Sequence, residues 1–472
     1  MVIAKENKMG TTPALKLLLS MALPLVISML IQSLYNVVDS IFVGKYANDA
    51  LTAIGLAWPM QNLIIALSTG MGVGINATLS KSLGEKNALK ASQTAFNGCI
   101  IMIGVYFLFF IIGLTLIPSY MKAISTNEAV IQYGITYLKY VVIGSLGIIF
   151  SITFERLLQA TGKTFLTMVA QACGAITNIL LDPCLIFGIG FFPKLGVAGA
   201  AIATLIGQYV GCFLGLIFNL KYNKEIVLKK ETIQLKLSVI KEILFIGIPS
   251  AVMAGISSVL TFLFNRILLV FYNVTIPNTH QTYNDLPQTV FGLYFKLNSI
   301  FFMPIFGINN AVVPIVAYNY GAKNKDKMMK TIKYSLIIVS IMMFIGTLLF
   351  LCIPRQLLTI FAENKDIADQ LTLVGVPCLR IICSSFMFAA FSIVLMSVFQ
   401  ALGNGFYSMI CSIIRQLIVL LPAAYLLSLT KNLNLVWLSF LIAEILALLV
   451  SIGLFVHLYR VKIKPIKNNT LR

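Results

Sequence analysis

Two carboxylates lie inside long apolar segments of this sequence, and each has polar neighbours at helical spacing. Gln32, Asn36 and Asp39 would share one face of a helix, and Asn178 and Asp182 are again one helical turn apart. A desolvated carboxylate can bind and release a proton near physiological pH, and together with amide oxygens it can instead coordinate Na⁺. The spacing predicts a cation-binding site formed by Asp39, Asn178 and Asp182. A hydrogen-bonded tie between two helices is the alternative.

Other polar residues in apolar segments are candidates for lining a substrate cavity. Gln32, Tyr35 and Asn36 lie in the segment "QSLYNVVDSIFVG", and Lys296 and Asn298 lie in "FGLYFKLNSIFF". Either Lys296 lines a central cavity or it holds a buried carboxylate.

Two further acidic residues have structural alternatives. Glu155 is either a functional acid of the cavity or part of an interfacial anchor or salt bridge, with Arg156 beside it. Glu444 is expected to pair with a cation such as Arg415. A charge at the bilayer centre costs about 2.5–3.5 kcal/mol on insertion scales, so charges at that depth indicate function by default.

The segments that hold these residues are apolar enough to cross a membrane. The chain has 472 residues, of which 59% are hydrophobic and 11% charged, whereas a soluble domain has about 25% charged residues. Apolar runs of about 20 residues recur, and a helix of that length crosses the hydrocarbon core. Since only helices and closed barrels satisfy the backbone in lipid, and these runs are too long for barrel strands, we expect an all-α polytopic membrane protein.

The apolar runs predict twelve transmembrane helices. The expected ranges are 14–44, 51–80, 95–117, 131–160, 164–190, 196–219, 241–272, 287–320, 331–353, 371–402, 406–428 and 434–459.

The basic residues indicate the orientation of these helices. The net charge is +19, and many of the Lys and Arg residues gather in the segment 220–241 and the loop 323–333. Because cytoplasmic loops carry an excess of Lys and Arg, this pattern predicts that both termini are cytoplasmic in a cell (plasma) membrane protein. The same rule accounts for the charge without a nucleic-acid partner.

The sequence carries no motif of an enzyme or a cofactor site. Its 8 cysteines are scattered through apolar runs without a CxxC pair, and it has only 2 histidines. No Walker lysine motif, H-E-x-x-H or G-x-S-x-G is present. We therefore expect neither catalysis nor a cofactor, and no metal beyond Na⁺ at the coupling site.

The two halves of the sequence resemble each other. "SKSLGEKN" (80–87) is similar to "AYNYGAKN" (317–324), and "LQATGKTF" (158–165) is similar to "FQALGNGF" (399–406). An even number of helices per half returns the chain to the same side of the membrane. We predict two six-helix bundles, 1–220 and 241–472, related by a pseudo-two-fold axis along the membrane normal and joined by a basic cytoplasmic linker, 221–240. The second bundle would end in a cytoplasmic tail.

The positions of Asp39 and Asp182 in their helices predict that the two carboxylates meet. Both helices run in the same direction, and each Asp precedes a glycine near the outer end, Gly44 and Gly190. The two carboxylates would therefore lie at similar depth, which makes a shared polar pocket possible. Pro183 leaves the carbonyl of residue 179 without its helix hydrogen bond, so we expect a bend there, either responsive to the cation or static.

Several segments, in their order and spacing, resemble the multidrug and toxic compound extrusion (MATE) transporters over nearly the full length of the chain. They are "PLVISMLIQSLYNVVDSIFVG", "ALTAIGLAWPMQNLIIALSTGMGVGINATLSKSLGEKN", "ERLLQATGK", "NILLDPCLIFGIG" and "VVPIVAYNYGAKN". The resemblance implies a V-shaped pair of six-helix bundles that exports drug-like molecules. It also implies roles: Asp39 matches the coupling acid of the first helix, Asn178 and Asp182 match the pair on the fifth, and Glu155 matches an acid of one bacterial branch.

The chain departs from this family pattern in its second half. Some members carry acids on the seventh and tenth helices, where this sequence has Asn265, Arg266 and Arg380. We therefore place the coupling site in the first half and leave H⁺ and Na⁺ as alternatives.

These observations predict a multidrug efflux antiporter of the bacterial branch. It would act as a monomer and export small organic, often cationic, compounds in exchange for H⁺ or Na⁺ by alternating access. A flippase for a lipid-linked precursor is the alternative, because four cations in apolar segments could bind an anionic headgroup. These are Arg266, Lys296, Arg380 and Arg415. The repeat and the off-axis carboxylates favour alternating access over a channel.

Overall fold

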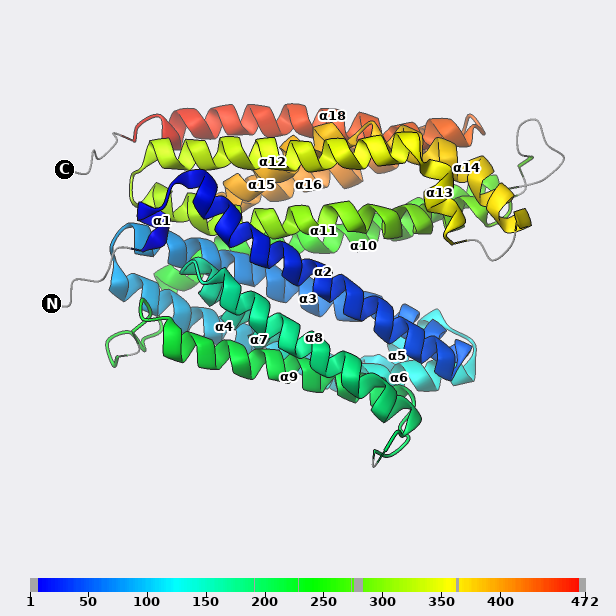
Figure 1. The fold of residues 1–472 in the computed structure, drawn as a ribbon, viewed down its shortest axis with the longest axis horizontal. Helices are drawn as coiled ribbons and strands as arrows, with labels where there is room; N and C mark the ends of the chain where they lie inside the picture. The colour runs from blue at the N-terminus through cyan, green and yellow to red at the C-terminus, as the bar shows by residue number, and fades with distance from the viewer. Residues whose placement is uncertain are drawn as a thin grey trace.

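The computed structural model describes residues 7–190, 192–227, 229–272, 274–275, 283–361 and 365–466, which form helices and their connections. The end of the predicted C-terminal tail, 467–472, lies outside the described residues. Figure 1 shows two groups of helices side by side. The first group contains α1 (Lys8–Thr11), α2 (Ala14–Tyr46), α3 (Asn48–Gly84), α4 (Ala88–Thr115), α5 (Ile117–Ile124), α6 (Glu128–Ile143), α7 (Leu146–Ala160), α8 (Thr164–Phe187) and α9 (Val197–Tyr222). The second contains α10 (Leu237–Leu268), η1 (Leu269–Phe271), α11 (Leu286–Gly321), α12 (Lys325–Cys352), α13 (Pro354–Thr359), α14 (Lys365–Cys383), α15 (Phe386–Ala401), α16 (Gly405–Ile413), η2 (Ile414–Leu420), α17 (Leu421–Ser428), α18 (Leu433–Leu458) and η3 (Tyr459–Ile463).

The helices account for the expected membrane spans, with two corrections. Within the described residues, ten helices are long and apolar enough to cross a membrane, and there are up to twelve spans if each of two bent pairs counts as one. The pairs are α6 with α7, bent by 44°, and α14 with α15, bent by 51°. The single helices expected at 131–160 and 371–402 are therefore wrong as continuous rods. The breaks fall between apolar flanks at 144–145 and 384–385, so hydropathy gives no sign of them.

The two similar segments adopt matching backbone conformations in the two groups. Asn87 and Asn324 both have φ −95° and ψ 80°, and the side chain of each caps the helix that follows. Gly162 and Gly403 both adopt left-handed turns, with φ +82° and +77°. The internal repeat read from the sequence is thus also present in the backbone.

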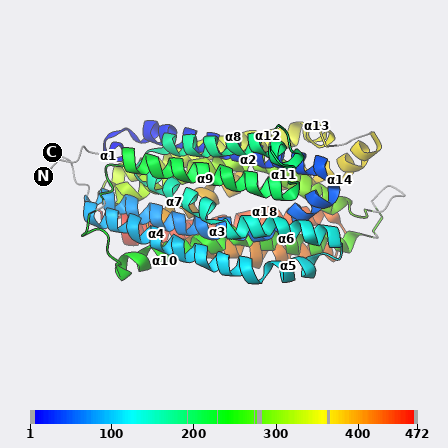
Figure 2. The same ribbon diagram turned by 90° about the horizontal axis from the view of Figure 1, so that it is seen from below.

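Glycines bring the two groups into backbone contact at one end of the molecule. Figures 1 and 2 place α1 at this end, here called the α1 end, and α5 and α13 at the opposite end, here called the α5 end. A Cβ added to Gly84 of α3 would lie 2.0 Å from the carbonyl oxygen of Tyr318 in α11. One added to Gly74 would lie 2.3 Å from the carbonyl oxygen of Ile243 in α10. Only glycine permits these approaches.

Polar contacts reinforce the α1 end of this interface. Glu242 of α10 pairs with Lys81 of α3 at 3.1 Å and with Lys90 of α4 at 2.7 Å. Arg156 of α7 donates a hydrogen bond to Asn310 of α11 at 2.8 Å. Each of these contacts joins the first group to the second.

Helix α2 connects the two groups. Its first half contributes Leu17, Leu18, Met21 and Leu25 to the hydrophobic core of the second group. Figure 1 shows the helix leaving that group and crossing towards α8 of the first. The residues around Asp39 therefore lie in the part of α2 that faces the first group.

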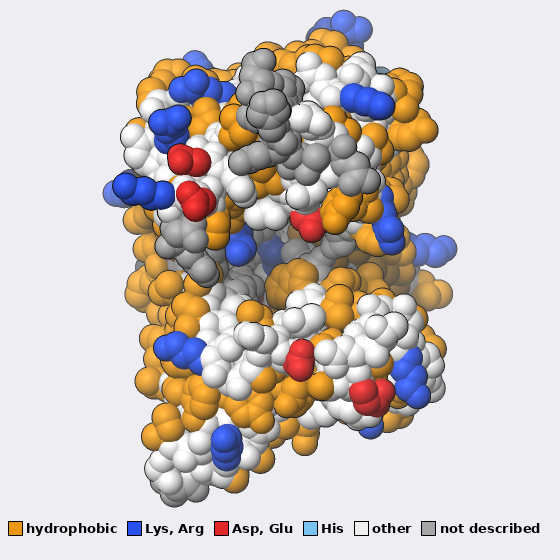
Figure 3. Space-filling view, turned by 90° about the vertical axis from the view of Figure 1, so that its right-hand side faces the viewer, with side chains coloured by type: hydrophobic (Ala, Val, Ile, Leu, Met, Phe, Trp, Pro, Cys, Tyr) orange, Lys and Arg blue, Asp and Glu red, His pale blue; other side chains and the backbone are white. Residues whose placement is uncertain are grey.

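At the α5 end the groups separate. The hydrogen bond from Asn62 of α3 to Ser258 of α10, at 2.8 Å, lies near the middle of these helices. Figure 3 views the α5 end and shows a hollow between the two groups, with Lys or Arg side chains inside it. The molecule is thus closed at the α1 end and open at the α5 end.

Candidate functional site

The predicted coupling residues are positioned by close packing of α8 against α9. A Cβ added to Gly174 of α8 would lie 2.7 Å from the carbonyl oxygen of Gly207, and one added to Gly207 would lie 2.6 Å from that of Gly174. Since neither glycine has a side chain, the two backbones meet. This approach lets side chains of α9 reach the polar face of α8 one turn away.

Asn178 is the centre of the polar cluster on α8. Its amide nitrogen donates to Asp182 Oδ1 at 3.2 Å and to Thr204 Oγ1 of α9 at 3.4 Å. Asp182 is fully buried, with 0% of its surface exposed, and Asn178 is 3% exposed. The cluster is therefore enclosed by protein and does not face lipid.

Asp39 reaches the same cluster from α2. Helix α2 packs against α8, and the Asp39 carboxylate contributes to the electrostatic environment of Asp182. It is also within electrostatic range of Tyr137, which donates to Gln61 at 3.4 Å in the interior of the first group. The structure thus brings Asp39, Asn178 and Asp182 together.

Several buried oxygen atoms in this region have no hydrogen-bond partner among the described residues. Among the described residues, three of them belong to the predicted coupling site: Asp39 Oδ1, Asn178 Oδ1 and Asp182 Oδ2. Nearby on α8 and α9, Gln171 Oε1 and Gln208 Oε1 are also buried without a hydrogen-bond partner among the described residues. Buried acceptors of this kind are unfavourable unless a donor or a cation occupies the space between them.

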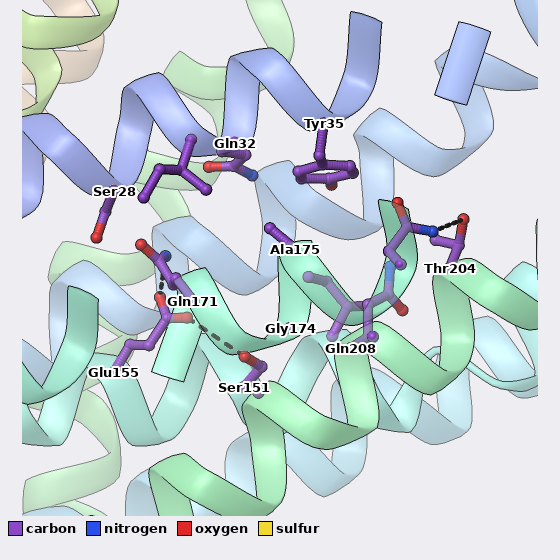
Figure 4. A pocket seen from close by; sticks show the side chains of 15 residues that line it. Ser28, Gln32, Tyr35, Ser151, Glu155, Gln171, Gly174, Ala175, Thr204 and Gln208 are labelled. Atoms are coloured by element: carbon purple, nitrogen blue, oxygen red, sulfur yellow. Dashed lines mark hydrogen bonds between the residues drawn. The ribbon is translucent and has the colours of Figure 1, made fainter. Parts of the chain in front are cut away.

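A pocket adjoins the cluster and is lined by Asn178 and by another acid, Glu155, whereas Asp39 and Asp182 are not among its lining residues. Gln32 and Tyr35 of α2 line it opposite α8 and α9, as Figure 4 shows. Glu155 of α7 lies at its base and accepts hydrogen bonds from Gln171 Nε2 at 2.7 Å and from Ser151 Oγ at 3.3 Å. Glu155 therefore lies in the interior, 7% exposed, and not at an interfacial salt bridge.

The remaining predicted cavity residues lie elsewhere. Asn36 is half-buried on α2 and is not among the residues that line this pocket. Asn298 of α11 is 9% exposed, and its Oδ1 lacks a partner. Lys296 is exposed on α11, about three helical turns from Gly307 and so on the same face. A Cβ on Gly307 would lie 2.8 Å from Val26 of α2, so this face points towards α2.

Two other expectations can be compared with the structure. Arg415 and Glu444 form an ion pair at 3.5 Å, which confirms the expected partner of Glu444. Pro183 lies inside α8, which continues to Phe187 and ends at Gly188 in a left-handed conformation. The helix is thus shorter than the expected range 164–190.

Thr204, Gln171 and Gln208 were not selected from the sequence. Thr204 and Gln208 are one helical turn apart in an otherwise apolar and small-residue stretch, the same signal that identified Asn178 and Asp182. Thr204 and Gln171 bond to residues on other helices, Asn178 and Glu155, so the sequence alone gave no reason to connect them with the cluster.

The donor set suits a proton or a hard monovalent cation. Carboxylate, amide and hydroxyl oxygens are the ligands that such cations prefer. In the part of the chain that the structure describes, no group of three or more His, Cys, Asp or Glu residues is placed to hold a metal ion. Na⁺ would instead depend on the amide and hydroxyl oxygens of Asn178 and Thr204 beside the two acids.

Comparisons with known proteins agree with this architecture. The profile of the MatE family matches residues 24–184 and 262–426. The probable multidrug resistance protein NorM of Thermotoga maritima is 28% identical over 87% of this chain and 85% of its own length. The multidrug export protein MepA of Staphylococcus haemolyticus is 24% identical over 91% of this chain and 90% of its own. A crystal structure of a MATE protein in complex with MaL6 superimposes with a TM-score of 0.88 at 23% identity, covering 98% of this chain and 99% of that one.

Proposed function

Because this chain belongs to the MatE family of membrane transporters, we propose that it exports organic compounds in exchange for H⁺ or Na⁺ by alternating access. The observation that supports this proposal best is the group of buried, unpartnered oxygens on Asp39, Asn178 and Asp182. A site that places two carboxylates within electrostatic range and leaves their oxygens unpaired is suited to take up a cation and release it again.

The arrangement offers a route from cation binding to movement. Asp39 belongs to α2, which also packs into the second group, whereas Asn178 and Asp182 belong to α8. A cation held between these helices favours the conformation in which the three side chains converge. Loss of the cation removes that preference, and a ligand shifts such an equilibrium only by its differential affinity for the two states.

The substrate would occupy the space between the groups and the adjoining pocket. Gln32 and Tyr35 line the pocket, and Lys296 is exposed on the face of α11 that points towards α2. With both termini in the cytoplasm of a cell-membrane protein, the hollow at the α5 end opens outward. The cation would then enter from outside as the substrate leaves.

The same proposal covers the organisation of the chain. Residues 1–220 and 241–472 would be the two moving bundles, the basic segment 221–240 would be their cytoplasmic linker, and a single chain would be the working unit.

Transport in proteoliposomes tests this function. Ethidium movement is measured under separately imposed H⁺ and Na⁺ gradients for the wild type, Asp182→Asn and Asp49→Asn. Asp49 is an exposed carboxylate at the start of α3, so Asp49→Asn makes the same chemical change outside the site. We expect one of the gradients to drive wild-type transport. Asp182→Asn should lower it by about tenfold or more, within the usual range of coupling energies.

Asp49→Asn should transport like the wild type. Gradient-driven transport at the wild-type rate in Asp182→Asn would contradict the proposal, provided that both variants elute as monodisperse protein.

A lipid-linked precursor flippase is the second candidate, and Lys296 is the observation that favours it. An exposed cation on the face of α11 that points towards α2 suits an anionic headgroup. Absence of ethidium transport under either gradient, with flipping of a fluorescent anionic lipid in the same vesicles, would favour the flippase.

A further inference from the structure

A second pocket lies at the α1 end, where the chain before α2 crosses the connection between α7 and α8. Residues of α1, of this connection and of the segment after α9 line it, among them Lys8, Lys163, Thr164 and Glu225. It is separate from the coupling cluster, and no step of the proposed transport uses it.

Positive charge in this pocket is only partly neutralised. Lys163 forms an ion pair with Glu225 and also donates to Asn223 Oδ1 at 3.4 Å. Lys8 has no acidic partner among the described residues, and a Cβ on Gly162 would lie 2.8 Å from its Cε, so its stem lies over that glycine. Partial burial and the neighbouring Lys163 charge both lower the pKa of Lys8. An anion beside Lys8 would relieve both effects.

The start of α8 supplies further donors. Lys163 stands at the N-cap position of this 24-residue helix and gives no side-chain cap. Its carbonyl oxygen accepts from the Leu166 amide at 3.1 Å, so the amides of Thr164 and Phe165 are the ones placed to serve a ligand. Gly162, with φ +82°, makes the turn that brings the chain into the helix. Thr164 lines the pocket, is only 1% exposed, and its Oγ1 has no hydrogen-bond partner among the described residues. A helix N-terminus with a free buried hydroxyl and a free ammonium attracts a negatively charged group.

The pocket also lies on a connection between the two groups of helices. Asn7 donates to the carbonyl oxygen of Thr161 at 3.2 Å and to Glu225 Oε1 at 3.3 Å. Two residues later, the carbonyl oxygen of Met9 accepts from Asn319 of α11 at 3.3 Å. A ligand in the pocket would therefore bind beside the segment that fastens the first group to the second.

We propose that this pocket binds a phosphate group, held by Lys8, the Thr164 hydroxyl and the first amides of α8. The phosphate can belong to a phospholipid headgroup or to a soluble phosphate. Exposed aromatic side chains beside the pocket, Phe165 at 61% and Tyr222 at 45%, place it at the level of lipid headgroups if the helices span the bilayer as described. Bound phosphate would hold α1 in place and stabilise the closed α1 end.

Binding to the purified full-length protein tests this proposal without any transport measurement. Dimyristoyl phosphatidylglycerol is titrated into detergent-purified protein and bound copies are counted by native mass spectrometry. The variants are Lys8→Gln, Thr164→Val, which keeps the side-chain shape, and Lys330→Gln. Lys330 is an exposed lysine of α12, so Lys330→Gln makes the same charge change away from the pocket. Inorganic phosphate is added as a competitor.

We expect the tightest phosphatidylglycerol site to weaken about fivefold or more in Lys8→Gln and Thr164→Val and to be unchanged in Lys330→Gln. Competition by millimolar inorganic phosphate would identify a soluble phosphate as the ligand, and resistance to it would identify the lipid. Phosphatidylglycerol and phosphate binding by Lys8→Gln and Thr164→Val with wild-type affinity would overturn the proposal, as would a wild type that binds neither probe.

Discussion

At the scale of residues, the side-chain amide of Asn178 determines which atoms of the proposed coupling site are left to accept a ligand. Asn178 directs its nitrogen towards Asp182 Oδ1 and Thr204 Oγ1, so the amide hydrogens have protein partners and its own oxygen does not. Asp182 Oδ2 and Asp39 Oδ1 are likewise left without partners. The three oxygen atoms are therefore acceptors that a cation or a hydrogen-bond donor would satisfy.

Thr204 gives the first prediction. Thr204→Val keeps the shape of the side chain but removes the hydroxyl that accepts from Asn178. The amide then loses one of the two bonds that orient it, and a hydrogen bond contributes a net stabilisation of about 1 kcal/mol. We expect the cation concentration for half-maximal ethidium transport to rise about fivefold, measured in proteoliposomes.

A matched control is Thr115→Val, which removes an exposed hydroxyl bonded within α4. An unchanged cation dependence in Thr204→Val would mean that Asn178 does not need this bond to orient its oxygen.

The sequence predicted the residues whose partners are local. Asp39, Asn178 and Asp182 share helical faces with polar neighbours one turn away, and a period of 3.6 residues is visible in any sequence. The bonds of Thr204 to Asn178 and of Gln171 to Glu155 join different helices. Such contacts depend on how α7, α8 and α9 pack, and this packing cannot be predicted from the sequence of one helix.

At the scale of elements, glycines set how closely helices approach and where the molecule closes. Gly174 and Gly207 bring α8 and α9 together at the coupling site, and Gly84 brings α3 against α11 at the α1 end. The sequence indicated most of these helices, because apolar runs are long. It could not indicate the breaks inside 131–160 and 371–402, since the residues on both sides remain apolar.

Gly84 and Gly55 of α3 provide a matched pair of substitutions. A Cβ on Gly84 would lie 2.0 Å from the carbonyl oxygen of Tyr318, whereas one on Gly55 would meet nothing within 4 Å. Overpacking of this kind destabilises by about 1–3 kcal/mol, while Ala in an open helix position is favoured over Gly by up to about 1 kcal/mol. We expect Gly84→Ala to lower the thermal unfolding midpoint, and Gly55→Ala to leave it unchanged or raise it.

The measurement is the loss of the monodisperse peak in size-exclusion chromatography after heating. Equal midpoints for the two variants would show that the contact of α3 with α11 does not depend on glycine at that position.

At the scale of the whole molecule, the two groups of helices meet at the α1 end and separate at the α5 end. Backbone contacts at Gly74 and Gly84, the Glu242 ion pairs and the Arg156 bond to Asn310 all lie on the closed side. The proposed coupling site lies where α2, which packs into the second group, meets α8 of the first. Helix α2 therefore connects the proposed site to the interface between the two groups.

The central claim is that cation and substrate movement are linked through this site, and linkage is reciprocal. If a cation gradient drives export, then a substrate gradient must drive the cation the opposite way. The most direct test is reverse exchange. Proteoliposomes with no ion gradient are given an ethidium gradient, and lumenal H⁺ and Na⁺ are followed with entrapped indicator dyes for the wild type and Asp182→Asn. We predict that the wild type moves H⁺ or Na⁺ in the direction opposite to ethidium and so builds an ion gradient, and that Asp182→Asn does not. Two results would contradict the account. One is equal movement of H⁺ or Na⁺ in the two proteins, and the other is ethidium movement by the wild type without movement of H⁺ or Na⁺.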